Sequence, residues 1–239
     1  MKYMLMLFGN DQVFRKRTPD ETAAVVERHR AVLEELRGAG KYVASERLRY
    51  RDEAVTIRPS DGGQVVVDGP FAETREVLGG FYLVEADSKD EAMAWAKKLP
   101  FDEHGAIEVR PARTGAQWRG PVQGKQRYMV MLVASEQTLG SQTRATIFES
   151  IDRHYELSLE LAARGRFVGS RSLGGGGEAS VLRSRDGVPV VSDGPFAETK
   201  ELVVGYFVVA CDSKQEAIEV GRELLFGLDA VEIRPVWEV

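Results

Sequence analysis

The sequence predicts an α+β protein made of two tandem copies of one unit. The motif Asp68–Glu76 (DGPFAETRE) returns as Asp193–Glu201 (DGPFAETKE), with eight of nine residues identical. The apolar run Tyr3–Leu7 (YMLML) returns as Tyr128–Leu132 (YMVML), and both pairs are 125 residues apart. Within each copy, short apolar runs alternate with amphipathic helical segments. One register held along so much of the chain indicates an internal duplication.

The duplication divides the 239 residues into residues 1–112, a linker of residues 113–126, and residues 127–239. Each copy is long enough to bury a hydrophobic core of its own. The segment between the copies, RTGAQWRGPVQGKQ, is rich in glycine and polar residues. That composition is typical of a short polar linker.

The first copy begins with a predicted strand, Lys2–Phe8, which a long predicted helix follows. Thr18 is placed to cap this helix, Pro19 suits its first position, and Glu21 completes a capping box. Glycines supply a stop signal near Ala39. The same pattern in the second copy predicts an equivalent helix.

The rest of the copy predicts a helix-backed sheet. In chain order, its elements are the strands Tyr42–Tyr50, Ala54–Arg58, Gln64–Val67 and Val77–Ala86, the helix Asp90–Leu99, and the strand Ala106–Arg110. This order is typical of an antiparallel, ferredoxin-like sheet of βαββαβ type. Helices cover one face of such a sheet and leave the other bare. We therefore expect the two copies to pack sheet to sheet as an intramolecular dimer.

Charge and composition exclude several classes of function. A formal net charge of −5 argues against a general nucleic-acid binder, although Arg15, Lys16 and Arg17 form either a local basic patch or a solvated loop. The three histidines show no metal-ligand spacing, and no nucleotide-binding motif is present, so neither a metal nor a cofactor is expected. The single Cys211 lies in an apolar run and is expected to be a buried, inert thiol.

Targeting signals are not apparent in the sequence. The apolar run at the N-terminus is too short for a signal peptide. No segment approaches the roughly 18 apolar residues of a membrane span. We therefore expect a cytoplasmic protein without a membrane partner.

The repeated motifs resemble those of the YCII-related superfamily, in particular its DGPFAETKE branch. The resemblance rests on DGPFAETRE and DGPFAETKE, on the later strands IEVRP and VEIRP, and on a histidine in the long helix of each copy. It covers nearly the whole chain, once per copy. It implies ferredoxin-like units that pair through their sheets into a dimeric α+β barrel. The superfamily includes a dehydrochlorinase of a chlorinated hydroxyquinol, and its fold is similar to that of muconolactone isomerases.

The resemblance also implies a His–Asp pair as the active site, which maps to His29 with Asp68 and to His154 with Asp193. A carboxylate that accepts a hydrogen bond from one ring nitrogen leaves the other nitrogen to act as acid or base. The residues alone also allow a structural interpretation. A histidine on the apolar stripe of a helix is commonly a core residue, and an aspartate before Gly-Pro readily forms an Asx turn.

Other repeated residues have open roles. The motif acids Glu76 and Glu201, like Glu73 and Glu198, are surface charges, ion-pair partners across the pseudo-twofold, or residues lining a cleft. Arg110 and Arg234, each before a proline, meet either a partner carboxylate or a bound anion. The pair Gly79-Gly80 becomes Val204-Gly205 in the second copy, so the two sites need not function equally.

Two functions fit these observations. The first is a cofactor-free lyase or isomerase of a small cyclic or aromatic molecule, in which His29 shuttles a proton and Asp68 orients it. His154 and Asp193 would form a second site. The alternative is a non-catalytic module that binds a small ligand or contacts an extracytoplasmic-function sigma factor, because genes of the resembled branch often lie beside genes for such factors. A homodimer of the fused pair is a further option.

Overall fold

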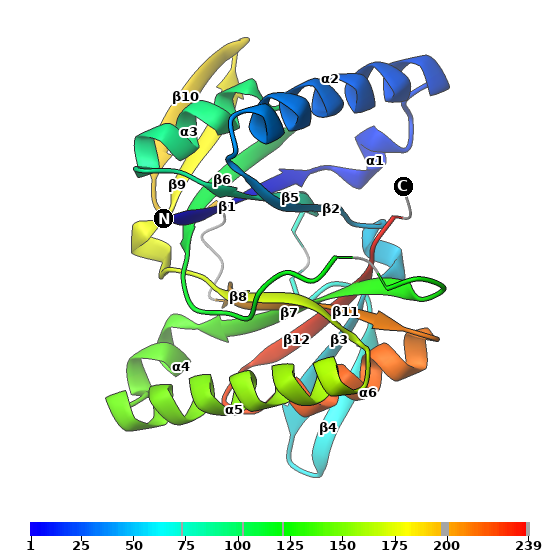
Figure 1. The fold of residues 1–239 in the computed structure, drawn as a ribbon, viewed down its shortest axis with the longest axis vertical. Helices are drawn as coiled ribbons and strands as arrows, with labels where there is room; N and C mark the ends of the chain where they lie inside the picture. The colour runs from blue at the N-terminus through cyan, green and yellow to red at the C-terminus, as the bar shows by residue number, and fades with distance from the viewer. Residues whose placement is uncertain (73, 102, 121, 197–200, 238–239) are drawn as a thin grey trace. The chain divides into compact units, whose positions relative to one another are not determined.

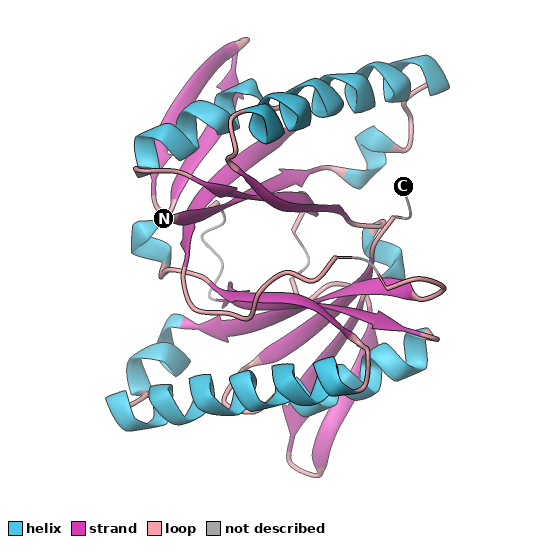
Figure 2. Ribbon diagram, in the orientation of Figure 1, coloured by secondary structure: helices cyan, strands magenta, loops and turns pink. Residues whose placement is uncertain are grey.

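The computed structural model describes residues 1–72, 74–101, 103–120, 122–196 and 201–237. They form two compact units, each an α+β arrangement around a six-stranded antiparallel sheet (Figure 1). The helices of each unit lie over one face of its sheet (Figure 2). The predicted α+β class is therefore confirmed.

The first unit takes most of its elements from the first repeat. Its sheet has the strand order β10-β9-β6-β1-β5-β2. Its elements are β1 (Lys2–Gly9), α1 (Asp11–Phe14), α2 (Pro19–Gly38), β2 (Tyr42–Arg47), β5 (Val77–Glu85), α3 (Lys89–Lys98), β6 (Gly105–Ala112), η2 (Gly176–Glu178), β9 (Ser180–Arg185) and β10 (Val188–Asp193). The last three elements come from the second repeat.

The second unit mirrors this composition. Its sheet has the strand order β4-β3-β12-β7-β11-β8. Its elements are η1 (Arg51–Glu53), β3 (Val55–Ser60), β4 (Gly63–Asp68), β7 (Gln126–Ser135), α4 (Glu136–Ser141), α5 (Arg144–Ala163), β8 (Phe167–Ser172), β11 (Glu201–Cys211), α6 (Lys214–Leu224) and β12 (Ala230–Pro235). Here η1, β3 and β4 come from the first repeat.

The two repeats therefore exchange a β-hairpin. In the second unit, β3 pairs with β12, for example Ile57 with Val231. In the first unit, β9 pairs with β6, for example Leu182 with Ile107. The division into residues 1–112 and 127–239 follows the sequence repeat. Each compact unit is instead completed by a hairpin from the other repeat.

Both faces of each sheet are buried. Tyr3, Leu5, Ile107 and the exchanged Leu182 pack with α2 and α3 in one core. Strand geometry points the alternate side chains to the opposite face. Four of these are at most 1% exposed in the first unit: Met4, Met6, Phe81 and Leu83. In the second unit, α5 and α6 form the equivalent helix-side core with Tyr128, Val130, Leu157, Phe207 and Val220.

The long helix α2 begins where the sequence predicts. Thr18 Oγ1 accepts a hydrogen bond from the Glu21 amide at 3.2 Å, and Glu21 Oε2 accepts one from the Thr18 amide at 2.8 Å. The predicted capping box is confirmed. The short helices α1 and α4 were not predicted, because so few residues cannot establish a helical period. Within the described residues, none of the helices has the length and apolar character that crossing a bilayer requires.

The first part of the linker packs along β8. The Ser172 amide donates to Thr114 O at 2.8 Å, and the Arg119 amide donates to Val168 O at 2.7 Å. The Trp118 ring lies against Gly169 and leaves no room for a Cβ there. Residues 114–119 thus cover a sheet edge. This part of the predicted linker, residues 113–126, is held in place because its backbone groups find partners on the neighbouring strand.

Candidate functional site

The Asp-Gly-Pro-Phe segment of each copy forms a turn at the end of an exchanged hairpin. Gly69 has a φ of 105°, and its amide donates to Ala54 O at 3.0 Å. Gly194 has a φ of 99°, and its amide donates to Ala179 O at 3.0 Å. Glycine adopts such left-handed angles without the steric cost that a Cβ brings. The repeated glycine of the motif is explained by this turn.

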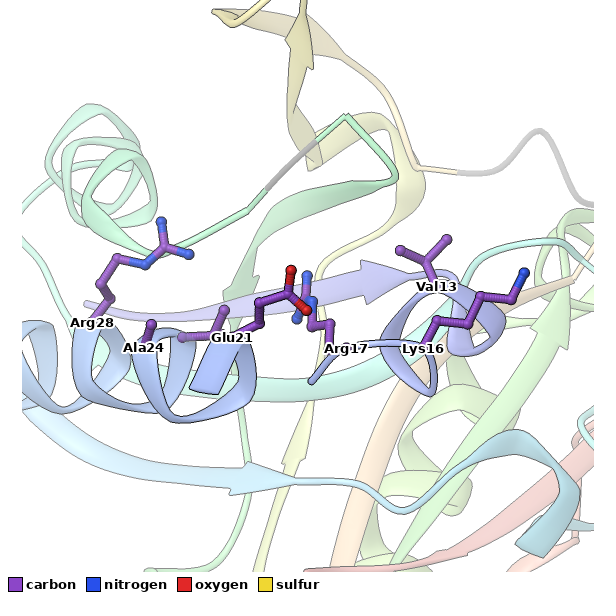
Figure 3. Close-up of a pocket in the computed structure, with 7 residues that line it drawn as sticks. Val13, Lys16, Arg17, Glu21, Ala24 and Arg28 are labelled. Atoms are coloured by element: carbon purple, nitrogen blue, oxygen red, sulfur yellow. The ribbon is translucent and has the colours of Figure 1, made fainter. Parts of the chain in front are cut away.

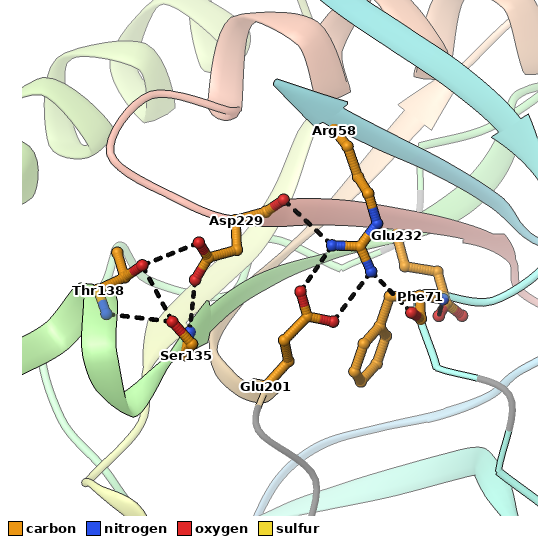
Figure 4. Close-up of polar contacts among 7 residues, drawn as sticks. All are labelled: Arg58, Phe71, Ser135, Thr138, Glu201, Asp229 and Glu232. Carbon is orange, nitrogen blue, oxygen red and sulfur yellow. Dashed lines mark hydrogen bonds and ion pairs between the residues drawn. The ribbon is translucent and has the colours of Figure 1, made fainter. Parts of the chain in front are cut away.

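In the second unit, the main chain of the motif phenylalanine is held from both sides (Figure 4). The Phe71 amide donates to Glu232 Oε2 at 2.9 Å, and Phe71 O accepts from Arg58 Nη2 at 2.8 Å. Arg58 also donates to both carboxylate oxygens of Glu201, at 2.6 and 2.9 Å. Glu201 is therefore an ion-pair partner, but its pair with Arg58 lies within the second unit, and an ion pair across the pseudo-twofold is not confirmed. Glu73 and Glu198 lie outside the described residues.

The first unit repeats this arrangement. The Phe196 amide donates to Glu108 Oε2 at 2.7 Å, and Phe196 O accepts from Arg183 Nη2 at 3.0 Å. The Phe196 ring stacks on Phe8 with 4.3 Å between ring centroids. Because each glutamate belongs to the repeat that receives the hairpin, these contacts fasten the exchanged hairpin to its new sheet.

Two buried ion pairs support the glutamates. Glu108 pairs with Arg110 on β6, and Glu232 pairs with Arg234 on β12. All four side chains are at most 3% exposed. Of the two alternatives for the arginines, the partner carboxylate is confirmed. Each glutamate uses one oxygen for the arginine and the other for a phenylalanine amide, which satisfies a charge that would be costly to bury alone.

The motif aspartates lie at exposed strand ends. Asp68 ends β4 in the second unit, and Asp193 ends β10 in the first unit. The Asp193 side chain is 92% exposed, and Ser180 Oγ donates to its Oδ1 at 3.1 Å. A solvated carboxylate has a screened effect on its neighbours.

His29 is positioned by a tyrosine in the first unit. It lies on α2, and its Nδ1 is 3.0 Å from the hydroxyl oxygen of Tyr82 on β5. The two rings stack with centroids 6.0 Å apart. Burial, together with the neighbouring cations of Arg28, Arg47 and Arg17, lowers the pKa of His29 to about 4. The imidazole is therefore neutral at pH 7. Burial also raises the pKa of Tyr82 to about 12, so its phenol stays protonated.

His154, at the equivalent position of α5, has different partners. Its Nδ1 lies 2.8 Å from Ser150 O, and its Nε2 lies 3.4 Å from Leu224 O. Its ring stacks on Phe226 with centroids 4.3 Å apart. Burial lowers its pKa, and the two carbonyl contacts oppose that shift. Each ring nitrogen thus faces a main-chain oxygen, and Ser150 Oγ also lies 3.4 Å from Nδ1. The neutral ring donates to one of these carbonyls only.

The difference between the copies follows from one substitution. Tyr82 in the first copy corresponds to Phe207 in the second, so the phenol that meets His29 has no counterpart on β11. The hydroxyl near His154 belongs to Ser150 on its own helix, at 3.4 Å from Nδ1. The sequence interpretation missed Tyr82. A comparison of the aligned copies for polar residues that only one of them carries would have found it.

The structure places the predicted His–Asp partners in different units. His29 and Asp193 belong to the first unit, whereas His154 and Asp68 belong to the second. The pairing of His29 with Asp68 and of His154 with Asp193 stays a prediction. The contacts within each unit give the histidines other hydrogen-bond partners.

A solvent-open cavity of about 470 Å³ lies between α1 and the first half of α2, and Lys16, Glu21, Ala24 and Arg28 in its lining are exposed (Figure 3). Its lining combines three cationic side chains, one carboxylate and three apolar side chains: Lys16, Arg17, Arg28, Glu21, Val13, Ala24 and Val25. The polar side chains extend to the same side of the two helices. Val25 lies one helical turn before His29 on α2, and Arg28 directly precedes His29 in the chain. The basic run lies in a turn with Arg15 and Lys16 exposed, as a solvated loop predicts, and its Lys16 and Arg17 also line this cavity.

The remaining candidates lie elsewhere. Cys211 is fully buried, and burial raises the pKa of its thiol to about 12, as expected for an inert cysteine. Among the described residues, no group of three or more His, Cys, Asp or Glu side chains is arranged to hold a metal ion.

Comparison with known proteins agrees with the duplication. A protein of Rhizobium meliloti (strain 1021) described as uncharacterized is 37% identical over 113 residues, which is 91% of that protein and 46% of this chain. A crystal structure described as "Putative Chlorite dismutase TA0507" shares 7% identity at a TM-score of 0.39, over 99% of this chain and 94% of that one. A likeness at this level says nothing of function. The model of the YCII-related domain matches residues 1–114 and again residues 126–239. The chain therefore belongs to the YCII-related family and carries two tandem copies of its domain.

Proposed function

We propose that this protein is a cofactor-free lyase or isomerase of a small organic molecule, with its working site in the first unit. His29 moves the proton and Tyr82 positions its ring. One observation carries the proposal: His29 Nδ1 meets the Tyr82 hydroxyl on the sheet, whereas each ring nitrogen of His154 faces a main-chain oxygen, with the Ser150 hydroxyl at 3.4 Å from Nδ1. The second copy then serves as scaffold and supplies the hairpin that completes the first sheet.

The tautomer decides which nitrogen reacts. When Nδ1–H donates to the Tyr82 oxygen, Nε2 keeps a free lone pair and acts as the base. Tyr82 can accept this hydrogen bond because its oxygen remains an acceptor while the phenol is protonated. A positioned histidine of this kind contributes about 10²- to 10⁴-fold in rate.

The low pKa of His29 restricts the chemistry. A base whose conjugate acid has a pKa of about 4 is fully available at pH 7 but weak. It removes only protons that are already acidic, such as those of phenols, enols or activated ring carbons. Eliminations and tautomerisations of cyclic molecules meet this requirement, and they need no metal or redox group.

The strand order supports a ferredoxin-like fold for each unit. Apart from the exchanged hairpin β3–β4, the first repeat has four strands, β1, β2, β5 and β6 in chain order. In the sheet they follow the order β6-β1-β5-β2, that is, fourth, first, third and second. We infer that each unit is ferredoxin-like, of βαββαβ type. Packing of the two sheets into a barrel remains part of the proposal.

The test compares equivalent histidines. Purified protein is incubated with chlorinated hydroxyquinols and with muconolactones, the substrate types that the family resemblance implies, and turnover is followed by chloride release and ultraviolet absorbance. His29→Gln should lower kcat by about 10²-fold or more, and Tyr82→Phe should lower it less. The matched control His154→Gln should leave kcat unchanged. Wild-type turnover by a folded His29→Gln variant would contradict this mechanism.

A regulatory module that contacts a sigma factor is the second candidate, and one feature of the second unit favours it. Helix α5 carries an exposed apolar stripe that has no equivalent on α2: Ile147, Phe148, Ile151, Tyr155 and Leu159. Exposed apolar patches of this kind mark protein-binding surfaces. A pull-down from native cells with wild type and with Ile151→Glu tests it. Equal recovery of a sigma factor by both proteins, or recovery by neither, counts against this function.

A further inference from the structure

We propose that the cavity between α1 and α2 binds a small organic anion with an apolar body, such as an aromatic carboxylate. This assignment names the ligand class of the first-unit site, and it rests on the proposed function only for what happens to the ligand after binding. The binding itself is argued from the cavity alone.

The charge of the lining selects an anion. Lys16, Arg17 and Arg28 face a cavity that contains one carboxylate, Glu21. That carboxylate already accepts hydrogen bonds from the Thr18 amide and hydroxyl, at 2.8 and 3.1 Å. Among the described residues, Lys16 and Arg28 have no carboxylate partner. Charge-assisted hydrogen bonds from such cations to a carboxylate are about twice as strong as neutral ones.

The apolar part of the lining selects an organic ligand over an inorganic ion. Val13 on α1 and Ala24 and Val25 on α2 line the same cavity as the cations (Figure 3). A volume of about 470 Å³ lies within the range typical of small-molecule sites, and it exceeds the need of a bare phosphate. The cations fix the charged end, and the aliphatic side chains contact the body of the ligand.

The second copy shows that this lining is not a feature of the fold. Lys16 corresponds to Ser141, Arg17 to Gln142 and Val25 to Ser150. Arg28 corresponds to Arg153, whose guanidinium lies over the Phe226 ring at 4.0 Å from its centroid. The copy whose helix histidine meets a tyrosine hydroxyl is therefore also the copy with the cationic cavity. Two independent differences between the copies point to the same unit.

The test uses benzoate as the probe and benzamide as its neutral match. Binding to the full chain is measured by isothermal calorimetry and by amide shifts in NMR spectra. Benzoate should bind at least about tenfold more tightly than benzamide, a difference of about 1.4 kcal/mol. The amides of residues 13–28 should shift on addition of benzoate. Inorganic phosphate should bind more weakly than benzoate because it leaves the apolar lining uncovered.

Variants separate the cavity from general surface charge. The double variant Lys16→Gln, Arg28→Gln should weaken benzoate binding about tenfold or more. The control Arg30→Gln lies on the same helix, pairs with Glu27 and is absent from the lining, so it should bind as wild type. A second variant, Ala24→Leu, fills the cavity without a change of charge and should also weaken binding.

Each outcome has one meaning. Equal affinity for benzoate and benzamide, or wild-type affinity in the folded double variant, overturns the anion site. Loss of turnover in His29→Gln with benzoate binding intact supports both the site and the proposed function. Turnover without benzoate binding removes this inference and leaves the proposed function standing.

Discussion

Glu108 and Glu232 each hold an arginine and a phenylalanine amide at the same time. These glutamates join the IEVRP and VEIRP strands to the Asp-Gly-Pro-Phe turns, although the two motifs are far apart in the sequence. The sequence shows that both motifs repeat, but not that one is the hydrogen-bond partner of the other. Much of the repeated motif is therefore explained by fold assembly.

Removing the charge of one glutamate should be strongly destabilising. Glu232→Gln keeps the shape but leaves Arg234 buried without its carboxylate, which costs about 3 to 5 kcal/mol in unfolding free energy. The control Glu201→Gln breaks the partly exposed pair with Arg58 and should cost about 1 kcal/mol or less. Urea unfolding measures both. Similar losses for the two variants would contradict this role of the buried pair.

His29 should make the stability of the protein depend on pH. Its pKa falls from 6.5 to about 4 on folding, so the unfolded chain binds the proton more tightly. The contribution of His29 is fully present above about pH 6.5 and is lost as the pH falls toward 4. The loss amounts to about 3 kcal/mol. Urea unfolding of wild type and His29→Gln between pH 4 and 7 checks this, because the variant should lack this part of the slope. Parallel profiles would show that His29 is not buried as a neutral ring.

At the scale of single elements, the capping box, the long helices and the final strands could be predicted because their signals are local. The pairing of β3 with β12 could not be predicted. The hydrophobic pattern of a hairpin is the same whether it joins the sheet of its own repeat or that of the other repeat. The site was predicted in part. His29 was identified by its repeat, and Lys16 and Arg17 by their clustering in the sequence. Tyr82 was missed because a repeat draws attention to residues that both copies share, and the second copy has Phe207 there. Lys16 and Tyr82 distinguish the first copy from the second, which has Ser141 and Phe207 at the equivalent positions.

The linker gives a prediction for one sheet edge. Gly169 on β8 accommodates the Trp118 ring, so Gly169→Ala should displace residues 114–119 from the strand. The Arg119 amide, which donates to Val168 O at 2.7 Å, should then exchange with deuterium faster. The control Gly175→Ala meets no atom within 4 Å and has a φ of −61°, so its exchange pattern should match wild type. Unchanged protection of Arg119 in Gly169→Ala would mean that the linker is not held by this contact.

At the scale of the whole molecule, neither repeat is sufficient for its own unit. A fragment of residues 1–112 lacks β9 and β10, and it loses Leu182 from its helix-side core. We expect this fragment to be unfolded or to self-associate, as judged by circular dichroism and NMR dispersion. Coexpression with residues 127–239 should restore a dispersed spectrum. A monomeric, folded fragment would show that the exchanged hairpin is dispensable.

The hairpin exchange also has a consequence during protein synthesis. The sheet of the first unit cannot be completed when β6 ends at Ala112, because β10 ends at Asp193. At ribosomal rates, the missing 81 residues take roughly 4 to 16 s to be made. Throughout that interval the edge of β6 and the core around Ile107 remain open on the nascent chain. The order in which the ribosome delivers the residues therefore delays the first repeat until more than half of the second has been made, and a slow or paused ribosome would lengthen its exposure to chaperones and proteases.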